Sequence, residues 1–333
     1  MFNKWYKIGL VILVVVLMMM ITLGTQAANK DKVVLTIATI YPPAQPATKA
    51  IEKAKELIEE KSNGEIELIH YTSGQLGNND ELAQGVVTGS VDMNAQSLSY
   101  FEDQFLEVEI DGFFYLYRDW DHMYKVWEGE VGQWFNDNLI EKAGVRILDT
   151  WIYGSRIITT KNKAIHSPDD LKGLKLRCPN AKVWIDMVSS FGCNAVPVAF
   201  NELYLALSQG IVDGQENPIS VVMSNKFDEV QNYMSLTYHK KNVIYILVNE
   251  KKWNSLTEEQ QKIVSDSFKE AREVNNKIIE VQDEEGIEKF KAGGGTVVEN
   301  PDREAFQAKV AKIYEMDEYK HLIELYNKIQ AVK

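Results

Sequence analysis

The sequence predicts an α/β protein made of two successive α/β units. Apolar, β-branched runs alternate with amphipathic helical stripes between residues 33 and 96, and the alternation returns between residues 174 and 209. The chain has 333 residues, a length sufficient for two domains. Such alternation is typical of βαβ units, so we expect a mainly parallel sheet.

Residues 1–27 have the features of a signal peptide and are expected to lie outside the fold. Lys4 and Lys7 precede an apolar run over residues 8–23, and residues 25–27 form a small-residue cleavage site. The alternative is an uncleaved membrane anchor, although the run is short for a transmembrane span. The segment therefore predicts export to an extracytoplasmic compartment such as the periplasm.

The chain is acidic, with a formal net charge of −12 and 25% charged residues. Nucleic acids and anionic membranes are themselves negative, so this charge argues against both as main partners. A small anionic ligand responds to its local site and not to the net charge of the protein. We therefore expect any anion site to consist of a few buried basic groups.

The first unit is predicted from three apolar runs that are separated by helical stripes. Gly64 ends the first helix, because glycine readily adopts the left-handed conformation of a C-cap. Asp119 is suited to cap a further helix, whose apolar face extends to Phe135. The expected elements are strands over residues 33–39, 65–71 and 91–96, and helices over residues 47–61, 80–88 and 119–135.

The second unit repeats the pattern and leads into a long helix. Thr257 and Gln260 form a capping box before an apolar stripe that persists to about residue 290. At 1.5 Å per residue this helix reaches roughly 50 Å, so we expect it to pack across both domains. Gly286 is a position where it is free to bend. The other expected elements are strands over residues 145–153, 157–160, 174–177, 194–198 and 243–249, and helices over residues 181–191 (capped by Asn180), 201–209 and 315–331.

The two cysteines outside the signal segment, Cys178 and Cys193, bracket the expected helix 181–191. Export permits a disulfide between them. Burial as free thiols is the interpretation that we favour, since cysteine is among the most buried residue types. No histidine lies near the pair, so the spacing predicts neither a metal site nor a nucleophile.

The sequence carries none of the common enzyme motifs. It has no nucleophile elbow, no zinc-protease motif, no phosphate-binding loop and no dinucleotide fingerprint, and its five histidines are scattered without ligand spacing. Asp119, Asp121 and His122 admit a metal interpretation, but acidic residues at a helix start are better explained as caps. We therefore expect no metal, no cofactor and no catalysis.

Two polar side chains stand where expected strands stop, which is where open α/β sheets bind ligands. Arg177 ends a short strand two residues before Pro179, and Asn217 directly precedes Pro218. The planar guanidinium of Arg177 fits a carboxylate through two hydrogen bonds.

Each of these residues also has a purely structural interpretation. Composition alone favours an ion pair of Arg177 with Asp213 or Glu216, because buried arginines are usually paired. Arg156 is a second candidate with the same alternative. Asn217 would otherwise cap its turn. Four aromatic residues either line a cleft or fill the core: Phe200, Trp151, Tyr153 and Trp184. For Trp184, which lies inside an expected helix, we favour the core.

At this point the residues match a known family. The chain resembles the extracytoplasmic solute-binding proteins of tripartite ATP-independent periplasmic (TRAP) transporters, of the dicarboxylate-binding (DctP) type. The similarity covers nearly all of the chain after the signal segment. It is carried by KSNGEIELIHYTSGQLG (61–77), YRDWDHMYKVWEGEVG (117–132), SPDDLKGLKLRCP (167–179) and ELYLALSQGIVDGQENP (202–218).

The resemblance implies a two-lobed periplasmic-binding-protein fold with hinge strands and a long helix spanning both lobes. Lobe I would comprise residues 28–153 plus 241–281, and lobe II residues 154–240 plus 282–333. In the binding site, Arg177 would clamp the ligand carboxylate with the assistance of Arg156. The remaining ligand contacts implied for this chain are Asn217 on the carboxylate side, Phe200 packing on the ligand, Gln96 and Ser97 from the first lobe, and more weakly Tyr41 and His239. Trp151 and Tyr153 would shape the far end of the cleft.

The function that the resemblance implies is that of a monomeric solute receptor, not an enzyme. It would capture an organic acid and deliver it to the small and large membrane subunits of a TRAP transporter. A sensory receptor for a membrane kinase would share the site and differ in its partner. A secreted lyase or hydrolase on a similar fold is the third alternative, and the missing catalytic motifs argue against it.

Overall fold

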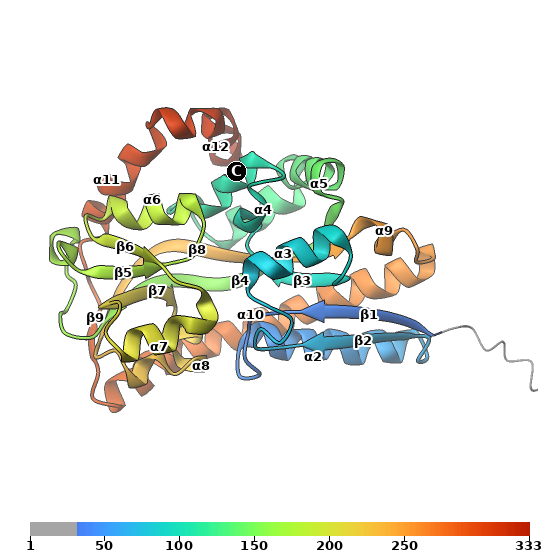
Figure 1. The fold of residues 1–333 in the computed structure, drawn as a ribbon, viewed down its shortest axis with the longest axis horizontal. Helices are drawn as coiled ribbons and strands as arrows, with labels where there is room; N and C mark the ends of the chain where they lie inside the picture. Colours follow the sequence, from blue (N-terminus) through green and yellow to red (C-terminus); the bar gives the residue numbers. More distant parts are fainter. Residues whose placement is uncertain (1–31) are drawn as a thin grey trace, which may run out of the picture.

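A computed structural model describes residues 32–333, so the expected signal peptide at residues 1–27 lies outside the described residues. The described chain folds around one sheet whose strand order is β2-β1-β3-β8-β4-β7-β5-β6, with β9 paired to β8 (Figure 1). The strands are β1 (Val33–Ala38), β2 (Ile66–Tyr71), β3 (Met93–Gln96), β4 (Val145–Thr160), β5 (Lys175–Cys178), β6 (Asn194–Pro197), β7 (Gly214–Pro218), β8 (Tyr233–Asn249) and β9 (Thr296–Val298).

The expected parallel pairing is found at the two ends of the sheet and between β8 and β9. β1 pairs in parallel with β2 and β3, and β5 pairs in parallel with β6 and β7. The three central pairings, β3 with β8, β8 with β4 and β4 with β7, are antiparallel. The sheet is mixed because two long strands run through its centre and join the two α/β units.

The first unit follows the sequence pattern closely. Helix α2 (Pro46–Lys61) starts with a proline in its first turn and buries a stripe that includes Ile51, Ala54 and Ile58. Helix α3 (Asn79–Thr88) begins with a capping box between Asn78 and Glu81 and ends at a left-handed glycine. Both helices connect parallel strands, as βαβ units require.

The second unit contains β5, β6 and β7 with helices α6 (Lys182–Ser190), α7 (Leu203–Ser208) and α8 (Ile219–Ser224). The predicted cap of α6 is wrong: Ala181 is its N-cap and no side chain caps it. The expected helix over residues 201–209 opens as the 3₁₀ turn η4 (Phe200–Glu202) before α7. Cys178 and Cys193 are free and buried thiols.

Strands β4 and β8 are the connection between the two units. They pair over almost their whole length, with register shifts that include one between Ile152 and Gly154. Gly154 has a φ of +123°, and a Cβ atom there would lie 2.7 Å from the Cβ of Pro218. Only glycine fits both the backbone conformation and this close approach. The shift lies near the middle of β4, where the strand passes close to Pro218.

The long helix α10 (Glu258–Ala292) spans both units, as the sequence predicts (Figure 1). Thr257 and Gln260 form the expected capping box. The helix packs on α2 and β4 and also on α8 and β9. Gly286 is buried, and a Cβ atom there would lie 2.6 Å from Cγ2 of Ile219 in α8. The absence of a side chain at this glycine therefore permits close contact between the two helices.

The remaining elements cover the outside of the sheet. The stripe expected over residues 119–135 forms two helices that break at Gly129, α4 (Trp120–Glu128) and α5 (Glu130–Ala143). The expected C-terminal helix starts as the 3₁₀ segment η6 (Asp317–Leu322). The others are α9 (Glu250–Trp253), α11 (Arg303–Tyr314) and α12 (Ile323–Ala331), with 3₁₀ turns η1 (Leu98–Phe101), η2 (Leu106–Gly112), η3 (Pro168–Leu171) and η5 (Phe227–Glu229).

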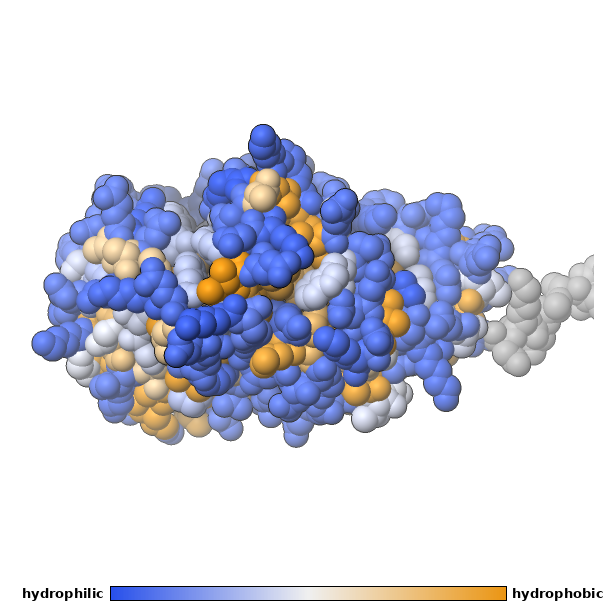
Figure 2. Space-filling model, turned by 90° about the horizontal axis from the view of Figure 1, so that it is seen from above, coloured by the Kyte–Doolittle hydropathy of each residue, from blue (hydrophilic) through white to orange (hydrophobic). Residues whose placement is uncertain are grey.

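The face that carries α11 and α12 is mostly hydrophilic, with apolar residues gathered near its middle (Figure 2). A groove between α4, α5 and α12 has Val126, Val131 and Leu325 in its lining. No helix within residues 32–333 is long and apolar enough to cross a membrane.

Candidate functional site

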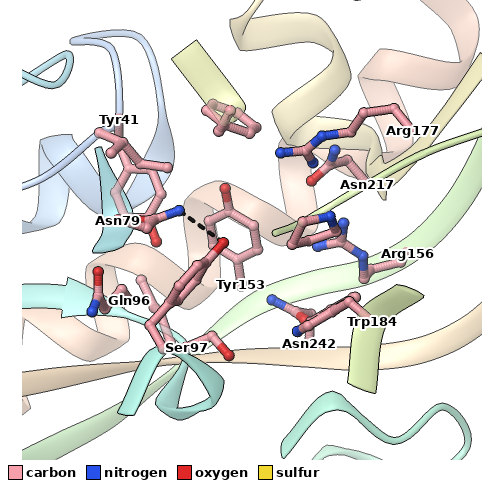
Figure 3. A pocket seen from close by; sticks show the side chains of 15 residues that line it. Tyr41, Asn79, Gln96, Ser97, Tyr153, Arg156, Arg177, Trp184, Asn217 and Asn242 are labelled. Atoms are coloured by element: carbon pink, nitrogen blue, oxygen red, sulfur yellow. Dashed lines mark hydrogen bonds between the residues drawn. The ribbon is translucent and has the colours of Figure 1, made fainter. Parts of the chain in front are cut away.

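A small cavity lies between the two units, at the carboxyl ends of strands from both. β1 leads into Ile40 and Tyr41, β3 ends at Gln96, and β5 and β7 carry Arg177 and Asn217. This is the position at which open α/β sheets bind ligands. The cavity measures about 50 Å³ and is lined by Ile40, Tyr41, Asn79, Gln96, Ser97, Tyr100, Tyr153, Arg156, Arg177, Pro179, Trp184, Phe200, Asn217, Asn242 and Ile244 (Figure 3).

Arg177 presents an unpaired positive charge to this cavity. The side chain is only 2% exposed, and its Nε donates to the carbonyl oxygen of Val198 at 2.8 Å. Its Cζ lies 5.8 Å from the centre of the Phe200 ring. Within residues 32–333 neither terminal nitrogen of Arg177 has a hydrogen-bond partner. Burial lowers the pKa of Arg177 from its ordinary value, because the charged form loses its hydration.

The ion pair with Glu216, which we considered as the structural alternative for Arg177, is made by Arg156 instead. Its Nε and Nη2 both donate to the Glu216 carboxylate, with Nη2 at 2.7 Å from Oε1, and Nη2 also donates to the Glu216 backbone oxygen at 2.5 Å. The other proposed partner of Arg177, Asp213, accepts from the backbone nitrogen of Lys175 at 2.8 Å. The structural interpretation of Arg177 as an ion pair is therefore wrong, while Arg156 makes an ion pair and also lines the cavity.

The Glu216 carboxylate is held ionised beneath the cavity. Burial by itself opposes ionisation, but Arg156 and His239 outweigh it and lower the pKa of Glu216 to about 2. The Nε2 of His239 lies 3.1 Å from Oε2 of Glu216, and its Nδ1 lies 2.8 Å from Oγ1 of Thr237. Burial lowers the pKa of His239. His239 is thus neutral near pH 7, donates to Glu216 and does not line the cavity.

Asn217 and Phe200 line the cavity. Asn217 lies on the same side as Arg177 (Figure 3). The Nδ2 of Asn217 donates to Oε1 of Gln215 at 2.6 Å, which leaves its second amide hydrogen for the cavity. The Phe200 ring lies beside the guanidinium of Arg177. Both residues therefore line the cavity beside Arg177, and their contact with a ligand stays a prediction.

The opposite side of the cavity carries uncharged polar groups (Figure 3). Gln96 is 1% exposed, and neither atom of its side-chain amide has a hydrogen-bond partner in the part of the chain that the structure describes. The hydroxyl of Ser97 donates to the Asp111 carboxylate, so its proton is directed away from the cavity. Tyr41 packs against Tyr153 with ring centres 5.4 Å apart.

Trp151 and Trp184 are both buried, but only Trp151 differs from what the sequence indicated. Trp151 is fully buried 6.0 Å from the ring of Phe268 in α10, its Nε1 donates to Asp149, and it does not line the cavity. Trp184 lies in the hydrophobic core, as we favoured, and it also lines the cavity. The Nε1 of Trp184 donates to Oγ of Ser99 at 2.9 Å, which links α6 to η1 across the cavity.

Some residues of the cavity carry no signal in the sequence. Asn79 opens α3 and its Nδ2 donates to the hydroxyl of Tyr100 at 3.1 Å (Figure 3). Asn242 lies in β8 immediately before the apolar run that the sequence predicts as a strand. The only sequence signal for a site role of Asn242 is that a polar residue directly precedes an apolar strand. Asn79 looked like an ordinary helix start.

The described residues contain no group of acidic, histidine and cysteine side chains suited to a metal ion. The Asp119 carboxylate, considered above as a metal ligand, accepts from the backbone nitrogen of His122 at 2.7 Å. The helix-cap interpretation of Asp119 is confirmed.

Comparison with known proteins identifies the family. The family described as bacterial extracellular solute-binding protein, family 7 (DctP), matches residues 37–321. The sialic acid-binding periplasmic protein SiaP of Vibrio cholerae is 33% identical over 259 residues, which cover 78% of this chain and 80% of that protein. The 2,3-diketo-L-gulonate-binding periplasmic protein YiaO of Escherichia coli is 33% identical over 257 residues, covering 77% and 78%.

Solved structures agree with these relatives. A TRAP periplasmic solute-binding protein from a Polaromonas species, bound to D-erythronate, superposes with a TM-score of 0.85 at 31% identity and covers 91% of this chain and 99% of its own. A second, from Roseobacter denitrificans with bound L-galactonate, has a TM-score of 0.84 at 28% identity, with coverage of 90% and 99%. The two-lobed α/β fold is thereby confirmed. The chain therefore belongs to the bacterial extracellular solute-binding proteins of family 7, as a solute-binding protein of the DctP type in TRAP transport.

Proposed function

We propose that this protein is an extracytoplasmic receptor that captures an organic acid by clamping its carboxylate on Arg177. The observation that carries the proposal is a fully buried guanidinium, directed into a cavity between two lobes, whose terminal nitrogens have no partner among the described residues. A buried charge without a partner is costly, and a ligand carboxylate removes that cost. The relatives support the proposal, since two of them are named for binding an organic acid and a third has an organic acid bound in its structure.

The other side chains on this wall assist in the clamp. Nη1 of Arg156 has no hydrogen-bond partner within residues 32–333, and Glu216 fixes the rest of that guanidinium. The second amide hydrogen of Asn217 reaches the same carboxylate. These donors come from β4, β5 and β7 of one lobe, so the acid binds this lobe first.

Closure of the other lobe completes the site. The hydrogen bond at 2.9 Å from Nε1 of Trp184 to Oγ of Ser99 joins segments on the two sides of the cavity. Closure excludes water, and the lower local dielectric strengthens the ion pair between ligand and arginine. The ligand therefore stabilises the closed state, because it binds that state better than the open one.

Export and delivery complete the proposal. Residues 1–27 direct the chain out of the cytoplasm, and cleavage releases a monomer. The lobes comprise residues 28–153 plus 241–281 and residues 154–240 plus 282–333. The closed receptor docks on the small and large membrane subunits of a TRAP transporter, and no covalent chemistry takes place. A sensory receptor would use the same site with a membrane kinase as its partner.

A thermal-shift screen tests the receptor function directly. Organic acids are compared with the amides of the same skeletons, so that only the carboxylate differs. An acid at about 100 times its dissociation constant is expected to add roughly 2.7 kcal/mol of stability, whereas its amide adds none. A broad panel of mono- and dicarboxylates and sugar acids that gives no shift would contradict the proposal. Uptake of the bound acid into vesicles holding the two membrane subunits distinguishes a transporter receptor from a sensor.

A further inference from the structure

The charges that face the cavity are confined to one side of it. Among its lining residues only Arg156 and Arg177 are charged. The charge of Arg156 is neutralised by Glu216, which leaves Arg177 as the single unpaired charge. Figure 3 shows both arginines on one wall with Asn217, facing the wall that holds Gln96. The cavity therefore offers one cation for one carboxylate.

The facing wall is polar but uncharged. Asn79 and Gln96 carry neutral amides, and Ser97 has its hydroxyl proton on Asp111. Tyr41 and Tyr100 are phenols, and burial raises the pKa of each above its ordinary value, so both keep their protons at neutral pH. A second anionic group of a ligand would meet no positive charge on this wall.

Gln96 indicates what the neutral wall binds. It ends β3, is 1% exposed and lines the cavity, and both its amide nitrogen and its amide oxygen are without a partner among residues 32–333. Buried amides are almost always hydrogen-bonded, and the place of Gln96 at the cavity makes these two atoms available to a ligand. The amide nitrogen donates and the oxygen accepts, and a hydroxyl group satisfies either atom. A carboxylate satisfies only the donor.

We propose that the receptor selects hydroxylated monocarboxylates against dicarboxylates, with the carboxylate on Arg177 and ligand hydroxyls on Gln96. The inference rests on the proposed function and specifies its substrate class. Gln96 is the specificity-determining residue, because it replaces the second cation that a dicarboxylate would need. The cavity of about 50 Å³ has room for a compact acid, since a water molecule needs about 10–15 Å³ by the same measure.

The size of the discrimination follows from the missing cation. An ionised carboxylate buried without a counter-charge is far costlier than a hydroxyl that finds a hydrogen bond. We expect a dicarboxylate to bind at least about 100-fold more weakly than the hydroxy acid of equal length. An acid without hydroxyls leaves the Gln96 amide unsatisfied, which is expected to weaken its binding about 10-fold or more.

Calorimetry with matched acids tests the inference. The four-carbon set is 2,3,4-trihydroxybutanoate, butanoate and succinate, and the six-carbon set is a hexonate, hexanoate and adipate. In at least one set the hydroxy acid is expected to bind most tightly. Gln96→Met keeps the length of the side chain and removes its hydrogen bonds. It is expected to weaken the hydroxy acid about 10-fold more than it changes the unsubstituted acid.

Asn94→Met is the control. Asn94 lies two residues earlier on β3, is fully buried, and also has an unpartnered amide, but it does not line the cavity. The Asn94→Met variant is expected to keep the preference for the hydroxy acid, whereas the Gln96→Met variant is expected to lose this preference. If Asn94→Met changes the preference equally, the effect comes from the strand and the assignment of Gln96 is wrong.

The outcomes separate this inference from the proposed function. Succinate or adipate binding as tightly as the matched hydroxy acid, with both lost in Arg177→Met, would overturn the substrate class and leave the receptor intact. Equal weakening of hydroxylated and unsubstituted acids by Gln96→Met would overturn the role of that residue. No binding of any acid in either set would count against the receptor function itself.

Discussion

Two neighbouring arginines give opposite predictions for the same substitution. In the ligand-free protein Arg177 is buried with one neutral hydrogen bond and no ion pair, whereas Arg156 makes a two-point ion pair with Glu216. Methionine retains the apolar stem of either side chain and removes the charge. We therefore expect Arg177→Met to change the free energy of unfolding little and Arg156→Met to lower it strongly.

The magnitudes follow from the contacts of each guanidinium. In Arg177→Met the carbonyl of Val198 loses a hydrogen bond worth about 1 kcal/mol, but the protein no longer buries an unpaired charge. The net effect is expected to lie within about 1 kcal/mol of wild type. Arg156→Met leaves the Glu216 carboxylate buried beside a neutral His239, and breaking a buried pair in this way costs about 3–5 kcal/mol.

Urea denaturation of the ligand-free protein at pH 7 measures both values. Calorimetry on the same samples is expected to show that Arg177→Met no longer binds the organic acid that the wild type binds, a loss of about 2–5 kcal/mol. The reasoning about Arg177 is refuted if Arg177→Met destabilises the ligand-free fold as much as Arg156→Met. That result would mean that the Arg177 charge is structurally paired.

Three further predictions concern pH, closure and packing. Because the pKa of Glu216 is lowered from 4.5 to about 2, its contribution to stability is present above pH 4.5 and is lost as the pH falls toward 2. The stability gap between wild type and Glu216→Gln is therefore expected to be about 2 kcal/mol smaller at pH 3 than at pH 6 in urea denaturation, and a constant gap would contradict this. Trp184→Phe removes the hydrogen bond to Ser99 across the cavity, so calorimetry should show ligand binding weakened about 5- to 10-fold; unchanged affinity would exclude this bond from closure. Gly286→Ala places a Cβ atom 2.6 Å from Cγ2 of Ile219 and should lower stability by about 1–3 kcal/mol in a thermal melt, although alanine normally favours a helix interior by about 1 kcal/mol; a rise in melting temperature would show that α8 moves aside.

Much of the fold could be predicted because its signals are local. The strands and helices of both units follow from short apolar periods, and the capping boxes are read from residues three positions apart. The length of α10 made its span across both units predictable as well. The antiparallel pairing of β4 with β8 could not be foreseen, because it joins segments some 90 residues apart.

The pairing of the arginines shows where local signals stop. Arg156 and Glu216 are 60 positions apart, and they meet because β4 pairs with β7 in a register that places Arg156 opposite Pro218. Arg177 lies on β5, on the other side of β7, and its side chain reaches the cavity without an acidic partner. No sequence pattern distinguishes these two arrangements.

Two aromatic residues of β4 also show that local sequence signals do not decide which side chains line the cavity. Trp151 and Tyr153 have the same parity along the strand, so the sequence gives them the same face. Trp151 lies under α10 against Phe268, while Tyr153 lies about two residues, or roughly 7 Å, further along and reaches the cavity. Trp151 packs against α10, whereas Tyr153 packs against Tyr41 and accepts a hydrogen bond from Gln45, so the neighbours of each ring decide between core and cavity.

The sequence by itself determined the α/β units, the capped start of α10 and the position of Arg177 and Asn217 where strands stop, because each depends on residues close together in the chain. Only the tertiary structure decided which arginine keeps a free charge, that Trp184 rather than Trp151 lines the cavity, and that Gln96 lines it with an amide that has no partner among residues 32–333. These features depend on strand register and on the contact between two lobes, where the side chains come from segments more than 50 residues apart.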